Sequence, residues 1–142
     1  MKSLHTLLKI AEADLETLRR ALAALLARQS AVEARIRAHE QSILAEQRLA
    51  MQDYESQRAY GGFVQLALQG KRALEAEREA IEQEIARMRT LISEAHVEMR
   101  KFERLIELEA EREKALADKR EADELDEFAT LRAARQTQTP SR

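Results

Sequence analysis

The sequence predicts an all-α fold, a long antiparallel two-helix coiled-coil hairpin with a C-terminal helical overhang. Charged residues make up 35% of the 142 residues, which include only three Gly and one Pro. Both halves of the chain carry apolar residues at alternating four- and three-residue spacing. Sequences with this composition and spacing form long helices packed side by side, so no thick central core is expected.

The first helix is predicted over residues 3–58, because an apolar stripe with coiled-coil spacing runs along it. Two polar residues, Gln29 and His39, interrupt this stripe, at a cost in stability that coiled coils tolerate. The apolar members of the stripe are Leu4, Leu8, Ala11, Leu15, Leu18, Leu22, Leu25, Val32, Ile36 and Ile43.

The second helix is predicted over residues 64–135, where the same spacing recurs. Burying the two matching stripes against each other is what would stabilise the hairpin. A paired arm of about 55 residues would be about 80 Å long. The second stripe consists of Leu74, Ile81, Ile85, Met88, Ile92, Ala95, Met99, Phe102 and Ile106.

The turn between the helices is predicted near residues 59–63. Gly61 and Gly62 are the only adjacent glycines, and glycine removes the steric cost of reversing the chain. Gly70 remains an alternative position for the reversal.

A register centred on residue 62 supports the glycine pair, because it brings the apolar residues of the two stripes opposite one another. Shifts of seven residues would also keep stripe against stripe, so the glycines and two pairs of opposite charges select this register. The register sets Leu18 opposite Ile106, Leu22 opposite Phe102, Glu46 opposite Arg78 and Asp53 opposite Lys71.

Toward the open end of the hairpin the second stripe becomes polar, and residues beyond about 121 have no partner in the first helix. Leu125, Phe128 and Leu131 lie there at three-residue steps. Unpaired apolar side chains on an exposed helix favour docking into a groove of a partner. The alternative is that this end folds back or frays. Residues 136–142 are predicted to be a disordered tail.

The sequence predicts neither an enzyme nor a cofactor. Catalysis needs groups that converge in a pocket from which water is excluded, and a two-helix rod offers none. The motifs of phosphate loops and metalloproteases are absent from the sequence. Cysteine is also absent, and His5, His39 and His96 lie far apart in the expected register, so no metal site is predicted.

Charge and hydropathy also limit the partners. The net charge of −2 gives no field that would gather nucleic acid, and the basic clusters are short and mostly flanked by acids. No stretch approaches the roughly 18 apolar residues that a membrane span needs, and the N-terminal segment turns acidic before a signal-peptide core could form. We therefore expect a cytoplasmic protein that binds no nucleic acid and does not insert into a membrane.

Two short motifs resemble those of a known family. Asp126, Glu127, Phe128 and Ala129 form a DEFA-like motif that is followed by Arg132. Tyr60, Phe63 and Val64 are similar to the Y-x-x-F-I motif at the start of the second helix in that family. With these motifs the chain resembles, over nearly its whole length, the FliJ family of flagellar export proteins. Leu131 precedes Arg132 and makes the spacing one residue longer than in some relatives.

The resemblance implies a stalk-like component of the bacterial flagellar type III export apparatus, peripherally associated with the membrane export apparatus. Its partners would be the export ATPase ring, the cytoplasmic domain of the membrane export gate and export chaperones, and the free protein would be monomeric. The resemblance places ATPase docking on Asp126, Glu127, Phe128 and Arg132. It places contact with the export gate on Tyr60, Phe63, Val64 and Ala67.

Two other interpretations stay open at this point. One is a structural coiled-coil spacer that associates with itself, and the other is the equivalent stalk of a virulence-type secretion system. For Phe63 and Val64, packing at the turn is the alternative to a contact with the gate.

Overall fold

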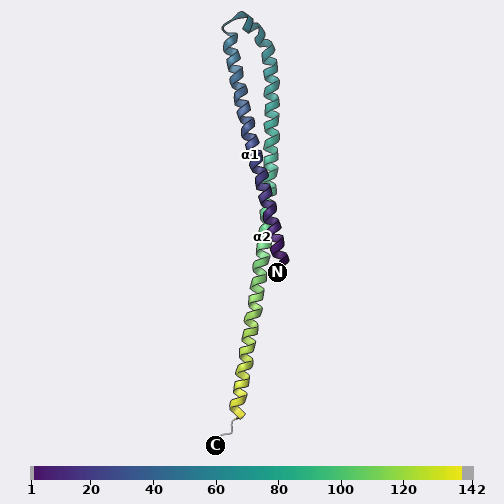
Figure 1. Cartoon of the computed structure of the whole chain (residues 1–142), viewed down its shortest axis with the longest axis vertical. Helices are drawn as coiled ribbons and strands as arrows, with labels where there is room; N and C mark the ends of the chain where they lie inside the picture. The colour runs from purple at the N-terminus through teal and green to yellow at the C-terminus, as the bar shows by residue number, and fades with distance from the viewer. Residues whose placement is uncertain (1, 139–142) are drawn as a thin grey trace. The chain divides into compact units, whose positions relative to one another are not determined.

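The computed structural model describes residues 2–138 as two helices, α1 (Lys2–Ala50) and α2 (Tyr54–Gln138). The helices pack against each other, and the described residues contain no strand. Figure 1 shows α1 and the first part of α2 side by side in opposite directions, joined by a short turn. The predicted all-α hairpin is therefore confirmed. Neither helix holds a segment apolar enough to cross a membrane.

The turn lies at residues 51–53, not at the predicted residues 59–63. Gly61, Gly62 and the alternative Gly70 are all inside α2, and none of them has a positive φ. The predicted boundaries of both helices at the turn, 58 and 64, are therefore wrong. These glycines are ordinary helical residues.

Asp53 explains why the chain reverses where it does. Its Oδ1 accepts a hydrogen bond from the backbone N–H of Glu55 at 2.9 Å, and its Oδ2 accepts one from the Ser56 hydroxyl at 3.5 Å. Aspartate is among the preferred residues at a helix N-cap, because its carboxylate satisfies N–H groups that have no partner in the first turn. Asp53 thus caps α2 instead of facing Lys71.

The chain divides into two compact units. One is Glu12–His96, which contains the turn. The other combines Met1–Ala11 with Val97–Arg142, of which the structure describes residues 2–11 and 97–138. We call the first the hairpin unit and the second the terminal unit, and describe each separately.

The core of the hairpin unit follows the predicted stripes. Ile81 is 2% exposed and Val32 is 3% exposed. Burying aliphatic side chains of this size contributes about 1.5–3 kcal/mol each, which makes this cluster the main source of stability in the unit. The cluster consists of Leu25, Val32, Ile81 and Ile85, with Leu22, Ile36 and Met88 packed against it.

The register of the two helices differs from the predicted one. In the hairpin unit, Arg35 forms an ion pair with Glu77 at 3.1 Å, whereas a register centred on residue 62 would set it opposite Arg89. In the terminal unit, Leu4 lies beside Ile106, which was predicted to face Leu18. Leu4 and Leu18 are two heptads apart, and a slip of two heptads keeps stripe against stripe. The predicted pairs that fail are Leu18 with Ile106, Leu22 with Phe102, Glu46 with Arg78 and Asp53 with Lys71.

The slip lengthens the overhang in the terminal unit. Glu109 is half-buried, and all side chains from Ala110 to Thr137 are exposed. The overhang, defined here as residues 110–138, therefore begins before the predicted residue 121. Residues 136–138 are helical, contrary to the predicted tail, and residues 139–142 lie outside the described part of the chain.

Candidate protein-docking surfaces

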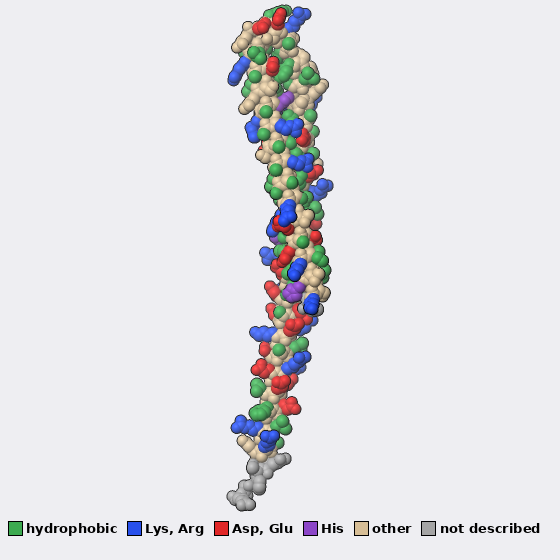
Figure 2. All heavy atoms as spheres, in the orientation of Figure 1, with side chains coloured by type: hydrophobic (Ala, Val, Ile, Leu, Met, Phe, Trp, Pro, Cys, Tyr) green, Lys and Arg blue, Asp and Glu red, His purple; other side chains and the backbone are tan. Residues whose placement is uncertain are grey.

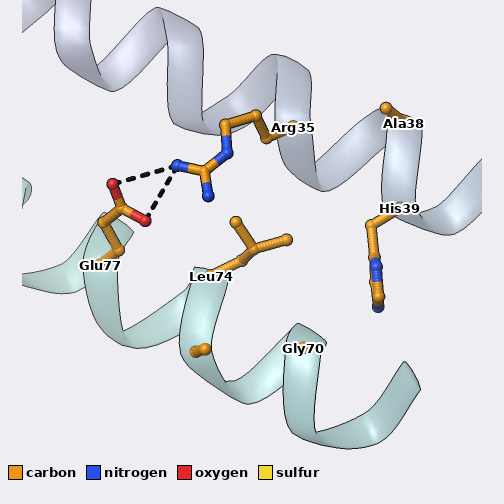
Figure 3. Close-up of a pocket in the computed structure, with 7 residues that line it drawn as sticks. Arg35, Ala38, His39, Gly70, Leu74 and Glu77 are labelled. Atoms are coloured by element: carbon orange, nitrogen blue, oxygen red, sulfur yellow. Dashed lines mark hydrogen bonds and ion pairs between the residues drawn. The ribbon is translucent and has the colours of Figure 1, made fainter. Parts of the chain in front are cut away.

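A groove between α1 and α2 in the hairpin unit holds the histidine that interrupts the first stripe (Figure 3). The His39 ring points from α1 toward Gly70 on α2. Its Nε2 donates a hydrogen bond to the carbonyl oxygen of Ala67 at 2.8 Å, since a carbonyl can only accept. A Cβ added at Gly70 would come within 3.0 Å of His39 Cε1, so the glycine makes room for the imidazole. The register centred on residue 62 would set His39 opposite Ile85, and this predicted placement is wrong.

The polar groups of this groove satisfy one another. Both carboxylate oxygens of Glu77 accept hydrogen bonds from Arg35 Nη1, at 3.1 and 3.2 Å. These side chains are about half exposed, so the pair adds at most about 1 kcal/mol. No group of three or more His, Cys, Asp or Glu residues suited to a metal ion occurs within residues 2–138. The hydrogen bonds of His39, Arg35 and Glu77 therefore join the two helices at this groove.

Alanine substitutions test the role of the glycines. We expect Gly61→Ala and Gly62→Ala each to raise the free energy of unfolding by about 1 kcal/mol, because alanine is the better helix former. Neither added Cβ would meet another atom within 4 Å. Gly70→Ala should raise the free energy of unfolding by less than either of these variants, since the His39 ring has to move. Urea unfolding followed by circular dichroism measures all three variants.

The control for Gly70 is the double variant His39→Ala with Gly70→Ala. In the His39→Ala background, the added methyl group at position 70 should raise the free energy of unfolding by as much as it does at positions 61 and 62. A loss of stability in Gly61→Ala or Gly62→Ala would contradict the helical placement of this pair.

The residues expected to contact the export gate lie near the turn, but they face the inside of the hairpin. Tyr60, Phe63 and Val64 are half-buried, and Ala67 is only 6% exposed. The rings of Tyr60 and Phe63 stack with centroids 6.1 Å apart and planes 27° apart. Their position on the first turns of α2 is consistent with packing near the turn, which was the alternative to a gate contact for Phe63 and Val64.

Other apolar side chains near the turn are exposed. Met51 is 90% exposed, Tyr54 is 76% exposed and Leu66 is 70% exposed. We call Met51 and Tyr54, which lie at the reversal of the chain, the tip surface; Leu66 lies about 18 Å further along α2. They lie off the two apolar stripes, so the spacing of apolar residues did not indicate them. The available signal was the N-cap at Asp53, which would have placed Met51 and Tyr54 at the reversal of the chain.

The residues expected to dock onto the ATPase all lie in the exposed overhang. Phe128 is 64% exposed, and Arg132 lies one helical turn beyond it on the same face. Asp126 lies on the opposite side of the helix, because two residues turn an α-helix by about 200°. Glu127 lies between these two sides. The predicted set thus surrounds the helix and does not form a single patch.

The apolar residues of the overhang form a face of their own. The coiled-coil spacing of α2 continues past Glu109 through mainly polar residues: Glu113, Leu116, Arg120, Asp123, Glu127 and Thr130. Leu125, Phe128 and Leu131 lie off that line and are 64%, 64% and 58% exposed. They are therefore not an extension of the hairpin core.

Charge in the overhang is divided along the helix. Residues 121–127 contain five acidic and no basic residues, and residues 128–138 contain two arginines and no acidic residue. Figure 2 shows hydrophobic side chains among the charged ones in this part of α2. We define the overhang face as Glu124, Leu125, Phe128, Leu131 and Arg132, which lie within about 120° of one another around the helix.

Comparisons with protein-family models, with curated proteins and with solved structures find no match to this chain.

Proposed function

We propose that this chain is a docking protein without enzymatic activity, a stalk-like coiled coil of the bacterial flagellar type III export apparatus. The observation that carries the docking role is the overhang, a helix on which Leu125, Phe128 and Leu131 are exposed and lie off the coiled-coil stripe of α2. Isolated helices with such a face are typical ligands of partner grooves. The flagellar assignment rests on the resemblance of the LDEFATLRAAR segment to the FliJ family.

The overhang docks into the ring of the export ATPase. Phe128 and Arg132 provide an aromatic and an arginine anchor on one face, and these residue types dominate binding energy at protein interfaces. Asp126 and Glu127 lie on other sides of the helix, so a ring opening that surrounds the helix would contact all four residues.

The end of the hairpin unit that carries the turn contacts the cytoplasmic domain of the membrane export gate. In this proposal Tyr60, Phe63, Val64 and Ala67 shape the first turns of α2, and the tip surface supplies the exposed contacts. Export chaperones are further partners. The protein is cytoplasmic, peripherally associated with the export apparatus, and monomeric when dilute and free, because the hairpin buries its own stripes.

Deleting residues 121–142 should abolish binding to the export ATPase ring and the stimulation of its activity, while leaving the remaining chain helical. Residues 121–137 of the deleted segment are all exposed, so removing them takes away no buried side chain. Phe128→Ala in the full chain should weaken binding at least tenfold, the range of interface hot spots. Titration of the labelled chain with purified ATPase measures the affinity.

Leu116→Ala is the matched control, because Leu116 is also exposed in the overhang but lies outside the overhang face. It should change the affinity less than twofold. Unchanged binding of the truncated chain would rule out the assignment of the overhang to ATPase docking.

The equivalent stalk of a virulence-type secretion system is the runner-up, since the same geometry would serve it. Parallel titrations with a flagellar and a virulence-type export ATPase separate the two, and preferential binding to the second would favour the runner-up. A self-associating coiled-coil spacer would instead be trimeric or tetrameric in light scattering at low concentration.

A further inference from the structure

We propose that the overhang face binds a second copy of this chain in antiparallel orientation, with Phe128 at the centre of the contact. Phe128, Leu125 and Leu131 are each more than half exposed on a helix that reaches Gln138. This pairing goes beyond the proposed function and does not depend on it.

The overhang face is symmetric in spacing and opposite in charge about Phe128. Leu125 and Leu131 lie three residues to either side, and Glu124 and Arg132 lie four residues to either side. In an α-helix these offsets place all four side chains on the face that carries Phe128.

A two-fold axis through the middle of the contact makes this pattern complementary to itself. Two antiparallel copies would bring Phe128 level with Phe128 of the second copy. On either side, one layer would hold Glu124 and Leu125 of one copy and Leu131 and Arg132 of the other. The glutamate and arginine side chains are long enough to pair across such a layer, and the leucines cover the ring edges. An interface of this kind, using the same surface on both copies, is the usual form of a two-fold dimer.

A parallel pairing of the same face is disfavoured by charge. It would set Glu124 against Glu124 and Arg132 against Arg132. It would also align the acidic segment 121–127, which has five carboxylates and no base, with its own copy. Like charges at close range repel, so the antiparallel orientation is selected.

The contact is small, and the dimer is therefore weak. Three large apolar side chains per copy fall short of the roughly 800 Å² per partner of a standard stable interface. We expect a dissociation constant on the order of 100 µM, with monomers dominating at low micromolar concentration. A partner that binds Phe128 more tightly would displace the second copy.

Charge reversal on the full chain tests this pairing by sedimentation equilibrium. Glu124→Arg alone and Arg132→Glu alone should each weaken dimerisation at least tenfold, because every outer layer then holds two like charges. An equimolar mixture of the two variants should recover the affinity of the unaltered chain, as should the double variant Glu124→Arg with Arg132→Glu. In a parallel pairing each single variant would keep two like-charged layers, as the unaltered chain does, and the mixture would bind more tightly than the unaltered chain.

A distance measurement reports the orientation directly. The chain has no cysteine, so Asp118→Cys provides a unique site for a spin label. Two labels ten residues from Phe128 should be about 30 Å apart in the antiparallel dimer and clearly closer in a parallel one. Asp118 lies outside the overhang face, and circular dichroism of each variant checks that it stays helical.

Three results would overturn the proposal. The first is a chain that remains monomeric up to about 1 mM, ten times the expected dissociation constant. The second is a mixture of the single variants that associates no better than either one alone. The third is a short label-to-label distance, which would show a parallel assembly.

Discussion

Ile81→Ala should lower the free energy of unfolding by about 2–5 kcal/mol, the range for removing a large aliphatic side chain from a core. Ile81 is 2% exposed and belongs to the cluster formed with Leu25, Val32 and Ile85. A hairpin of two helices has few other buried side chains to compensate. Because domains are stable by only about 5–15 kcal/mol, this one change should remove a large share of the total. Urea unfolding followed by circular dichroism at 222 nm, near the usual helical minimum, measures it.

Leu66→Ala is the control for that experiment. Leu66 is on α2 in the same unit and is similar in size, but it is 70% exposed. Its replacement should change the free energy of unfolding by less than about 0.5 kcal/mol. Equal losses in the two variants would show that the cluster around Ile81 does not carry the stability of the hairpin unit.

Cross-linking should distinguish the observed register from the predicted one almost completely. The variant Arg35→Cys with Glu77→Cys places two thiols at positions whose native side chains are 3.1 Å apart across the helices. A short bifunctional thiol reagent should join them within one chain in nearly quantitative yield. Gel mobility and mass spectrometry of the product measure the yield, and dilute protein limits links between chains.

The matched control keeps Arg35→Cys and moves the second thiol to Arg89→Cys, the position that a turn at residue 62 would bring opposite. In the observed register this site lies twelve residues from Glu77, about 18 Å along α2. Little intramolecular product is therefore expected. A higher yield for the second pair than for the first would support the register centred on residue 62 and contradict the observed one.

The fold class followed from the sequence because the spacing of apolar residues determines which helical faces must be buried. Residues with the strongest stripe character, such as Val32, Ile81 and Ile85, are among the most buried. The register did not follow, because a stripe with a seven-residue period matches its partner equally well after a slip of whole heptads.

The turn was missed because the glycine pair was given more weight than a capping residue. Glycine is required for a reversal only where the backbone needs a positive φ, and no described residue has one. Asp53, with Ser56 three residues later, was the physical signal for the start of α2.

The candidate surfaces were predicted in part. Phe128 and Arg132 are on the exposed overhang that the sequence indicated, but Asp126 is on the other side of the helix. Tyr60 and Phe63 are packed against each other inside the hairpin, while Met51 and Tyr54 are exposed near the turn. The position of the turn decides which side of each helix is covered. The exposure of these residues could therefore not be inferred while the turn was misplaced.

The buried stripes of the hairpin and the overhang face consist of different residues, and this affects how such proteins can diversify. Inserting seven residues in each arm of the hairpin would keep every layer of the seam matched, because the heptad period is preserved. Leu125, Phe128 and Leu131 would be unaffected, since they contribute nothing to that seam. The length of the hairpin and the surface that binds a partner can therefore evolve independently on the same pair of helices.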